Sequence, residues 1–371
     1  MKIKVGLLAA ATLVGANLHA APFAALGDNA ELFLTASASI TIDDNIYLRN
    51  TNEVDDMIFT FTPGLDLVFG RNALLSGNVY YRHAILRYSD VSQQNTDLLS
   101  VGFNSLYDNG KTKFDVGASY AENAQNEISA PGAIVASDTM NFRVLSEFGL
   151  SQKTTFGVGL RYDETDYSAG GAFRNSNIWT LPVDLYFEAT PKMQVSVGYR
   201  YRSTDLSGTG IDNVDHFLNV GARGEFTPKL VGQVRVGYNK RTFERTLADD
   251  SGLGVDASLS YAYSAKSTFN LAVSNDFGNS AIGDSTESFG LTVGGRVKLD
   301  EQWSWNANLA FRSIDYPTRS DDYFEGNVGF RYAYSAFLDF TGSYTHRKLS
   351  SSRAQFEFAN NVFFVGANIR Y

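Results

Sequence analysis

The sequence alternates apolar and polar residues with a period of two along most of its length, and this pattern restricts the possible folds more than any other feature. In the segment 31–42 the apolar positions are Leu32, Leu34, Ala36, Ala38, Ile40 and Ile42. Successive side chains of a β-strand point to opposite faces, so each alternating segment predicts a strand with one apolar and one polar face.

About eighteen such segments follow one another, and we expect a total between 16 and 18 strands. The segments are residues 31–42, 57–69, 73–88, 96–107, 112–122, 138–150, 154–163, 176–189, 193–203, 214–226, 230–241, 252–264, 267–276, 286–299, 302–314, 322–334, 336–347 and 356–371. An even number of strands is typical of a single-chain bacterial barrel.

The connectors alternate between tight turns and longer polar stretches. The tight turns are 70–72, 108–111, 151–153, 190–192, 227–229, 264–266, 300–301 and 335. The longer stretches are 43–56, 123–137, 164–175, 204–213, 242–251, 277–285 and 348–355. A meander of this kind has one rim of hairpins and one rim of loops, which predicts short periplasmic turns and longer extracellular loops.

Strands that cross lipid must close into a barrel, because each unpaired backbone group in hydrocarbon costs several kcal/mol. A soluble sandwich is the alternative, but no segment is left to cover so many apolar faces. The outward rows end in aromatic residues that suit the headgroup level, namely Tyr81, Tyr120, Tyr162, Trp179, Tyr199, Tyr201, Tyr238, Tyr261, Tyr263, Trp303, Trp305, Tyr332 and Tyr334. We therefore predict an all-β fold, a transmembrane antiparallel up-and-down β-barrel over residues 31–371.

The composition excludes several other classes of protein. The chain has no Cys, which removes disulfide frameworks, thiolate metal sites and cysteine nucleophiles. Its net charge of −9 disfavours nucleic acid as a partner. Although 44% of the residues are hydrophobic, the sequence lacks the several apolar runs of about 20 residues that a helical membrane protein needs.

The first twenty residues have the pattern of a secretory signal peptide. A basic start with Lys2 and Lys4 precedes the apolar stretch 5–14, and small residues around Ala20 form a cleavage site. A buried N-terminal helix is the alternative, although the apolar run is too short to span a bilayer. We expect residues 1–20 to be removed and 21–30 to form a short periplasmic segment, in a protein located in the outer membrane of a diderm bacterium.

The C-terminal segment ends on an aromatic residue and has one apolar face, made of Phe363, Val365, Ala367, Ile369 and Tyr371. It resembles the terminal signal strand of outer-membrane proteins. That resemblance implies recognition by the barrel assembly machinery and surroundings of outer-membrane lipid and lipopolysaccharide.

The N-terminal part of the barrel resembles the start of the putative β-barrel porin type 2 family. The resemblance is sharpest over 43–97, which contains the stretches 43–47, 55–56, 62–65, 80–82, 87–88 and 95–97. It implies an outer-membrane barrel of a kind often associated with exopolysaccharide production, with polysaccharide export components as partners.

The register that puts the aliphatic residues outside directs many charged residues into the lumen. The expected inward cations are Arg82, Arg143, Arg161, Arg200, Arg202, Arg223, Arg235, Arg296, Arg312, Arg331 and Arg370. The expected inward anions are Asp66, Asp115, Glu147, Asp163, Asp184, Glu188, Glu225, Asp256, Glu325 and Asp339. Salt bridges within the wall are one interpretation, and an electrostatically segregated pore is the other.

A local basic patch is our candidate for a selectivity wall in the lumen. It comprises Arg200 and Arg202 on one strand, with Arg161 and Arg223 on flanking strands. A barrel of this size is wide enough for an aqueous channel unless a loop folds into it. The stretches 43–56 and 123–137 are long enough to do so.

No catalytic, cofactor-binding or metal site is predicted. The acidic pairs 43–44, 55–56, 249–250 and 321–322 have no dedicated cation-binding spacing, and solvated loop charge explains them. An outer-membrane hydrolase would need a nucleophile, a His and an acid together. His83, His216 and His346 fall on distant strands, where interfacial positions explain them.

The sequence therefore predicts a channel and not an enzyme. Small hydrophilic or sugar-like solutes would pass in a porin-like manner, or exopolysaccharide would be exported, through a polar lumen without a cofactor. A non-conducting structural or adhesin-like barrel remains the alternative. The pattern does not determine the solute, its direction or the oligomeric state.

Overall fold

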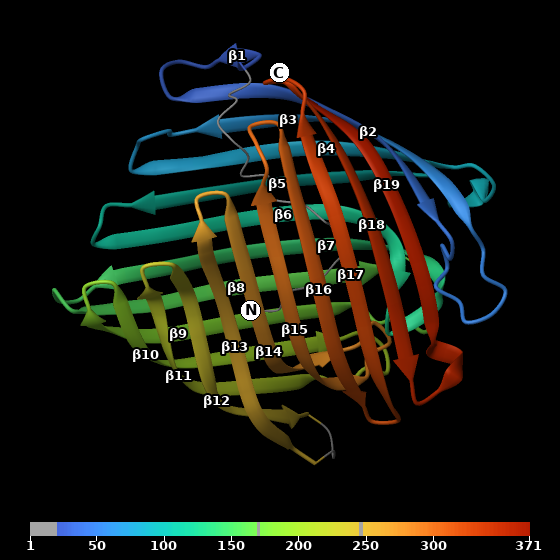
Figure 1. Ribbon diagram of the computed structural model, residues 1–371. Coiled ribbons are helices and arrows are strands. Elements are labelled where there is room, and N and C mark those ends of the chain that lie inside the picture. The colour runs from blue at the N-terminus through green and yellow to red at the C-terminus, as the bar shows by residue number, and fades with distance from the viewer. Residues whose placement is uncertain (1–20, 169–170, 245–247) are drawn as a thin grey trace.

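Each long strand pairs with its neighbours along the chain, which gives an antiparallel meander (Figure 1). The computed structural model describes residues 21–168, 171–244 and 248–371. The predicted signal peptide, residues 1–20, lies outside the described residues.

The strands are long enough to cross a membrane at a tilt. They are β2 (Ala30–Asp43), β3 (Asp56–Phe69), β4 (Leu75–Tyr88), β5 (Thr96–Asp108), β6 (Thr112–Glu127), β7 (Ala130–Gly149), β8 (Thr154–Tyr167), β9 (Ser176–Thr190), β10 (Met193–Leu206), β11 (Asn213–Thr227), β12 (Leu230–Phe243), β13 (Asp250–Ser264), β14 (Ser267–Asn279), β15 (Ser285–Lys298), β16 (Trp303–Tyr316), β17 (Arg319–Ala333), β18 (Leu338–Ser351) and β19 (Phe358–Arg370). A short β1 (Ala24–Ala25) pairs with the start of β2.

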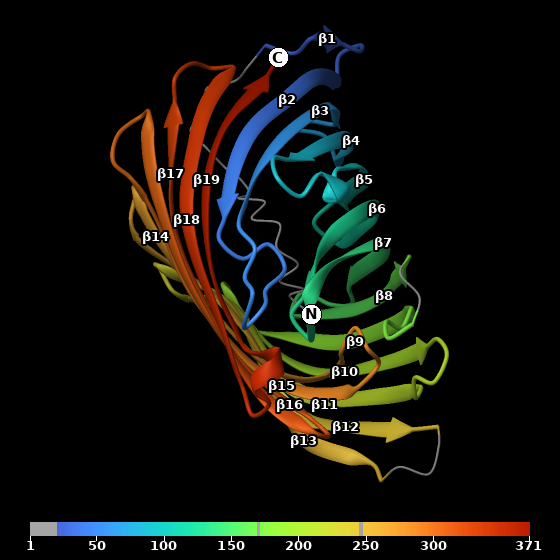
Figure 2. The same ribbon diagram turned by 90° about the vertical axis from the view of Figure 1, so that its right-hand side faces the viewer.

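The first and last long strands close the barrel. β19 pairs antiparallel with β2 from Val362↔Asp43 to Arg370↔Thr35. Figures 1 and 2 show these two strands side by side, with the wall curving around a lumen. The pairing removes both edges of the sheet, as a strand in lipid requires. The prediction of a closed all-β antiparallel barrel is confirmed, and the ring β2 to β19 has eighteen strands.

The outer face of the wall is apolar. Val220 is 63% exposed, Val365 62% and Leu253 60%, and each alternates along its strand with inward residues. Aromatic residues predicted for the girdle, including Trp179, Tyr238, Tyr263, Trp305 and Tyr334, are also exposed. Such an extended apolar surface would be a liability in water and is the expected surface of a barrel in lipid.

One rim has shorter connections than predicted. The segment 123–137, expected to be a loop, is mostly strand, because β6 and β7 continue to a turn at 128–129. On the same rim, β16 and β17 are joined at 317–318, so the predicted strands 302–314 and 322–334 extend toward each other. A backbone ladder needs no apolar face, so the strands continue where the alternation has faded.

The helical content of the described residues is confined to two 3-10 turns, η1 (Ser92–Gln94) and η2 (Ala354–Phe356). In these residues no helix has the length and apolar character needed to span a bilayer.

The closure of the ring can be tested with a disulfide, because the natural chain has no Cys. Ala38 and Ala367 face each other in the β2–β19 register. Directly opposed residues are close enough to be bridged. The double variant Ala38→Cys/Ala367→Cys should therefore form an intramolecular disulfide in the refolded protein, detected by mass spectrometry and by a reductant-sensitive gel shift. The control Ala38→Cys/Phe363→Cys, four residues out of register, should stay reduced. Equal cross-linking of both variants would contradict the register.

Candidate functional site

The inner face of the wall contains ion pairs between neighbouring strands. Among these pairs are Arg82–Asp66 at 2.5 Å, Arg143–Asp115 at 3.1 Å, Arg331–Asp339 at 3.1 Å and Arg347–Glu325 at 3.4 Å. Most of them join residues that the alternation had directed inward. The lumen is therefore polar, and much of its charge is neutralised locally, as the salt-bridge interpretation expects.

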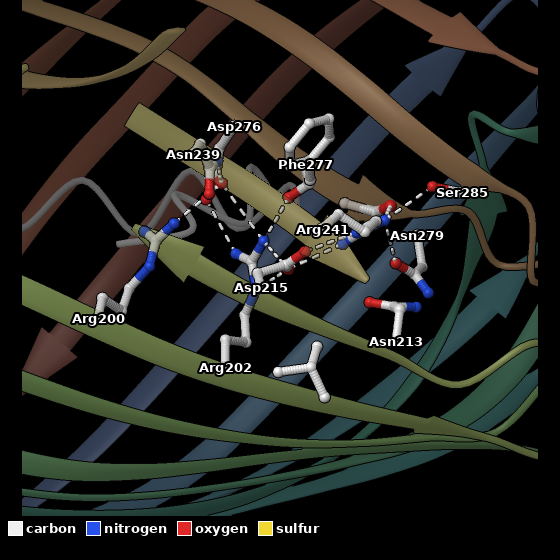
Figure 3. Close-up of polar contacts among 12 residues, drawn as sticks. Arg200, Arg202, Asn213, Asp215, Asn239, Arg241, Asp276, Phe277, Asn279 and Ser285 are labelled. Atoms are coloured by element: carbon white, nitrogen blue, oxygen red, sulfur yellow. Dashed lines mark hydrogen bonds and ion pairs between the residues drawn. The ribbon is translucent and has the colours of Figure 1, made fainter. Parts of the chain in front are cut away.

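The densest cluster of charge, which we call the ion-pair network, comprises Arg200, Arg202, Asp215, Arg241 and Asp276. Asp215 on β11 lies between Arg202 on β10 and Arg241 on β12 in the strand register. Its carboxylate accepts from Nε of Arg202 at 2.6 Å and from Nε of Arg241 at 2.6 Å. Asp276 on β14 accepts from Arg200 and Arg202, each at 2.9 Å (Figure 3).

The ion-pair network holds the end of β14 away from its neighbour β13. The β13–β14 ladder stops at Val255↔Asn275, although β14 continues to pair with β15 as far as Asn279. Two carbonyls of this freed stretch accept from arginines: Phe277 O from Arg202 at 2.8 Å, and Gly278 O from Arg241 at 2.7 Å. The guanidinium groups thus replace the missing strand as hydrogen-bond donors and place β14 in contact with β12.

The distal part of β6 and β7 also leaves the wall. The β5–β6 ladder ends at Ala121 and the β7–β8 ladder begins at Ser137, so residues 122–136 form a two-stranded hairpin arm. At its tip, Ser129 O accepts from Arg319 of β17 at 2.7 Å, and Ser129 Oγ accepts from the backbone N–H of Ala281 at 3.2 Å. The strands β8 to β13 separate β7 from β14 in the ring, so the hairpin arm crosses the mouth of the lumen.

The connection 44–55 between β2 and β3 folds inward beside the hairpin arm. Ile46 packs with Tyr88 and Val91, and Leu48 belongs to a second buried cluster with Tyr323, Leu349 and Phe358. The hairpin arm meets this connection through Asn126 Nδ2, which donates to Ile46 O at 2.8 Å, and through the N–H of Gly132, which donates to Tyr47 O at 2.8 Å. Both segments that the sequence indicated as long enough to enter the channel therefore narrow the same mouth.

A cavity of about 220 Å³, which we call the lumen pocket, lies on the wall between β7 and β13. Three members of the predicted selectivity wall line it: Arg161, Arg200 and Arg223. The fourth, Arg202, is 3% exposed and belongs to the ion-pair network. The structure thus brings three of the four residues to one cavity, and their role in selectivity stays a prediction.

The arginines of the lumen pocket differ in their partners. Arg223 binds Glu147 through two hydrogen bonds, at 2.6 and 2.9 Å, and its guanidinium lies 3.4 Å from the ring centroid of Tyr186. Arg200 binds Asp276. Arg161 has neither an ion pair nor a hydrogen bond to another side chain within the described residues, and its buried Nε has no partner. The predicted basic patch is therefore largely neutralised, with Arg161 as the exception.

A second cavity, of about 520 Å³, lies at the rim of short turns, between β2 to β4 and β15 to β19. Charged side chains from several strands line it, among them Arg82, Arg370, Asp66 and Asp300. Asp300 lies in the turn 299–302, where the backbone N–H groups of Trp303 and Gln302 donate to its carboxylate. These bonds hold the pKa of Asp300 below its usual value, because they favour the ionised form.

Three residues of the ion-pair network were missed by the sequence analysis: Asp215, Arg241 and Asp276. Each lies at or next to the loop-side end of its predicted segment, where the alternation was not followed further. Asp215 is in phase with Arg223, and Arg241 with Arg235, so an extension of the same period would have found both. Nothing in the sequence indicated that Asp276 would reach β10, four strands away.

The other residues named from the sequence are placed as follows. Phe363, Val365, Ala367, Ile369 and Tyr371 lie on the outward side of the closing strand or at its end, and their role in assembly stays a prediction.

His83, His216 and His346 lie on β4, β11 and β18, which are not neighbours. His216 contacts the hydroxyl of Tyr199 at 2.6 Å, and His346 contacts Asn361 at 2.9 Å. Within the described residues, no group of carboxylates and histidines is arranged to hold a metal ion.

Comparison with known proteins identifies a family and a fold. The family model described as Putative beta-barrel porin 2 matches residues 21–371. The crystal structure of OccAB4 from Acinetobacter baumannii is similar, with a TM-score of 0.51 and 13% identity over 93% of this chain and 99% of that one. A BenF-like porin from Pseudomonas fluorescens Pf-5 has a TM-score of 0.51 and 10% identity over 92% of this chain and 99% of that one.

OpdK from Pseudomonas aeruginosa, crystallised with vanillate, has a TM-score of 0.50 and 10% identity over 93% of this chain and 100% of that one. At these identities the likeness concerns the fold alone. No curated protein matches the sequence.

The ion-pair network should contribute strongly to stability. Asp215→Asn removes the carboxylate shared by Arg202 and Arg241, and breaking a buried ion pair costs about 3–5 kcal/mol. We expect the free energy of unfolding in detergent, measured with guanidinium chloride and tryptophan fluorescence, to fall by about that amount. Asp97→Asn breaks the half-exposed pair with Arg87 and should cost about 1 kcal/mol or less. Equal losses in the two variants would show that the network is not a structural anchor.

The hairpin arm should limit conductance. Replacing residues 125–135 by the turn Asn-Gly joins the register partners Ala124 and Ala136, and removes the part that crosses the mouth. We expect a larger single-channel conductance in planar bilayers. The same turn in place of 228–229, on the opposite rim, should leave the conductance as it is. An unchanged conductance in the shortened variant would mean that the hairpin arm does not bound the passage.

Proposed function

The chain belongs to the family described as Putative beta-barrel porin 2, and from that premise we propose that it is an outer-membrane channel for small hydrophilic solutes. The observation that carries this proposal is the closed wall of eighteen strands with an apolar outer face and a charged inner face. Such a wall offers water and polar solutes a route that the surrounding hydrocarbon denies them.

The mechanism needs no covalent step. A solute enters one mouth, exchanges part of its water for wall hydrogen bonds and leaves at the other, with width and charge setting its rate. Ion pairs such as Arg82–Asp66 and Arg223–Glu147 keep the inner side chains in defined positions. They also present hydrogen-bonding groups to the passing solute.

The narrowed mouth supports small solutes over exopolysaccharide. The hairpin arm and the connection 44–55 are tied to each other and to the far wall, so the passage is bounded on the loop side by backbone and not only by side chains. A polysaccharide chain needs a wide and continuous path along the whole lumen. Its export would require these tied segments to move together.

Planar bilayer recordings of the refolded mature protein test the proposal. We expect stepwise openings, because each inserted barrel adds one aqueous path. In swelling assays on proteoliposomes, the rate should fall steeply as the mass of an uncharged sugar increases, since the mouth is narrow. Unfolded protein added at the same concentration serves as the control. A persistently sealed bilayer together with an absence of swelling would favour the non-conducting structural barrel instead.

A further inference from the structure

We propose that Arg161 forms, with the lumen pocket, a binding site for small organic anions that carry one carboxylate. This inference rests on the proposed channel function and names the class of solute for it. It follows from the charge, the strand register and the shape of the pocket, each of which points to the same missing partner.

The arginines of the lumen pocket are not all paired with carboxylates. Its lining contains four guanidinium groups, from Arg161, Arg200, Arg223 and Arg235, and three carboxylates, from Glu147, Asp184 and Asp256. Arg223 forms an ion pair with Glu147 at 2.6 Å. Arg235 forms an ion pair with Asp184 at 3.0 Å and lies 4.0 Å from Asp256. Arg200 reaches out of the pocket to Asp276. Among the described residues, only Arg161 of the four makes no ion pair within 4 Å, and the carboxylates Asp163 and Asp256 act on it only at longer range.

The strand register increases the need for an anion at this position. Arg161 on β8 lies directly opposite Arg143 on β7, and Thr180 faces it on β9. Like charges opposed across a ladder destabilise each other. Arg143 is occupied by Asp115 and Asn104, which accept from it at 3.1–3.2 Å. A bound carboxylate would relieve the repulsion and supply an acceptor for the unpartnered Nε of Arg161.

The walls of the lumen pocket suit a carboxylate with an apolar body. Leu145, Pro182 and the ring of Tyr186 line it together with the arginines. Gly159 makes this possible, because a Cβ at that position would meet Leu145 Cδ2 at 2.5 Å and Pro182 Cγ at 3.1 Å. These two side chains can therefore close over β8. The planar guanidinium of arginine binds a carboxylate through two parallel hydrogen bonds, which a lone halide cannot use.

The size of the cavity favours a small solute. Its volume of about 220 Å³ lies below the range of roughly 300–1,000 Å³ that is typical of ligand pockets. An oligosaccharide would not fit, whereas an anion the size of benzoate would. One unpaired cation matches one carboxylate, so a monoanion is preferred over a dianion.

Block of the channel by sodium benzoate tests the inference. In planar bilayers, benzoate should reduce the single-channel current of the wild type in a concentration-dependent manner, and neutral benzyl alcohol should not. Arg161→Gln should raise the half-blocking concentration by about tenfold or more, because charge-assisted hydrogen bonds are lost. Arg161→Lys should give an intermediate value, since lysine keeps the positive charge but cannot form the two parallel hydrogen bonds of a guanidinium group.

Arg347→Gln is the matched control, because Arg347 is an inward arginine on β18 that is paired with Glu325 and lies outside the lumen pocket. It should leave the half-blocking concentration unchanged. If benzoate blocks the wild type and Arg161→Gln equally, or if benzyl alcohol blocks the wild type as well as benzoate does, the anion site is overturned. The channel function would still stand, because it rests on the conductance itself.

A measurement that needs no conductance separates the two proposals. Titration of benzoate into the detergent-solubilised wild type, followed by calorimetry, measures benzoate binding whether or not the barrel conducts, and the Arg161→Gln variant assigns that binding to the lumen pocket. If the wild-type barrel does not conduct but binds benzoate, and Arg161→Gln abolishes that binding, the site is retained and the channel function is refuted. The absence of binding in the wild type would refute the site, whatever the conductance. If Arg161→Gln fails to fold, the comparison of benzoate with benzyl alcohol on the wild type still decides the question.

Discussion

The pairing of β19 with β2 is the constraint on which the rest of the structure depends. Hydrocarbon offers no hydrogen bonds, so a wall in lipid tolerates no free strand edge. The ladder from Val362↔Asp43 to Arg370↔Thr35 removes the last two edges. Once the ring is closed, alternation assigns every side chain either to lipid or to the lumen. The apolar outer face, the polar interior and the two rims all follow from this closure.

Departures from the regular ladder occur on the rim of longer connections. The hairpin arm and the end of β14 both leave the wall, and charged side chains take over the hydrogen bonds that a neighbouring strand would have made. Asp56 does the same for the connection after β4, where it accepts from the N–H groups of Ser89, Asp90 and Val91. Asp56, the first residue of β3, is 3% exposed, so it is not the solvated loop charge expected from the sequence but an acceptor that holds this connection in position. The narrow mouth is a consequence of such anchors, because they tie the hairpin arm to the opposite wall and to the connection 44–55.

The lumen combines structural charge with charge that remains available. Buried carboxylates such as Asp215 are saturated by two arginines and hold neighbouring strands together, and they leave no charge for a solute. Removing either partner of such a pair exposes the other to a large desolvation cost. Arg161 differs from the other arginines of the lumen pocket, because Glu147 and Asp184 are paired with Arg223 and Arg235 and because Asp163 and Asp256 make no ion pair with it. This distinction separates a wall that is merely polar from one that can discriminate between solutes.

The sequence by itself determined the barrel, a strand number between 16 and 18 and the inward side of the strands, because the period of two is a local property set by lipid on one face and water on the other. It also directed Arg161, Arg200, Arg202 and Arg223 into the lumen. Only the tertiary structure decided which of them keep a free charge. Asp276 meets Arg200 and Arg202 across several strands, because the end of β14 departs from β13. Contacts of that kind depend on the curvature of the closed wall and on strands that leave it, and alternation along one strand carries no information about either.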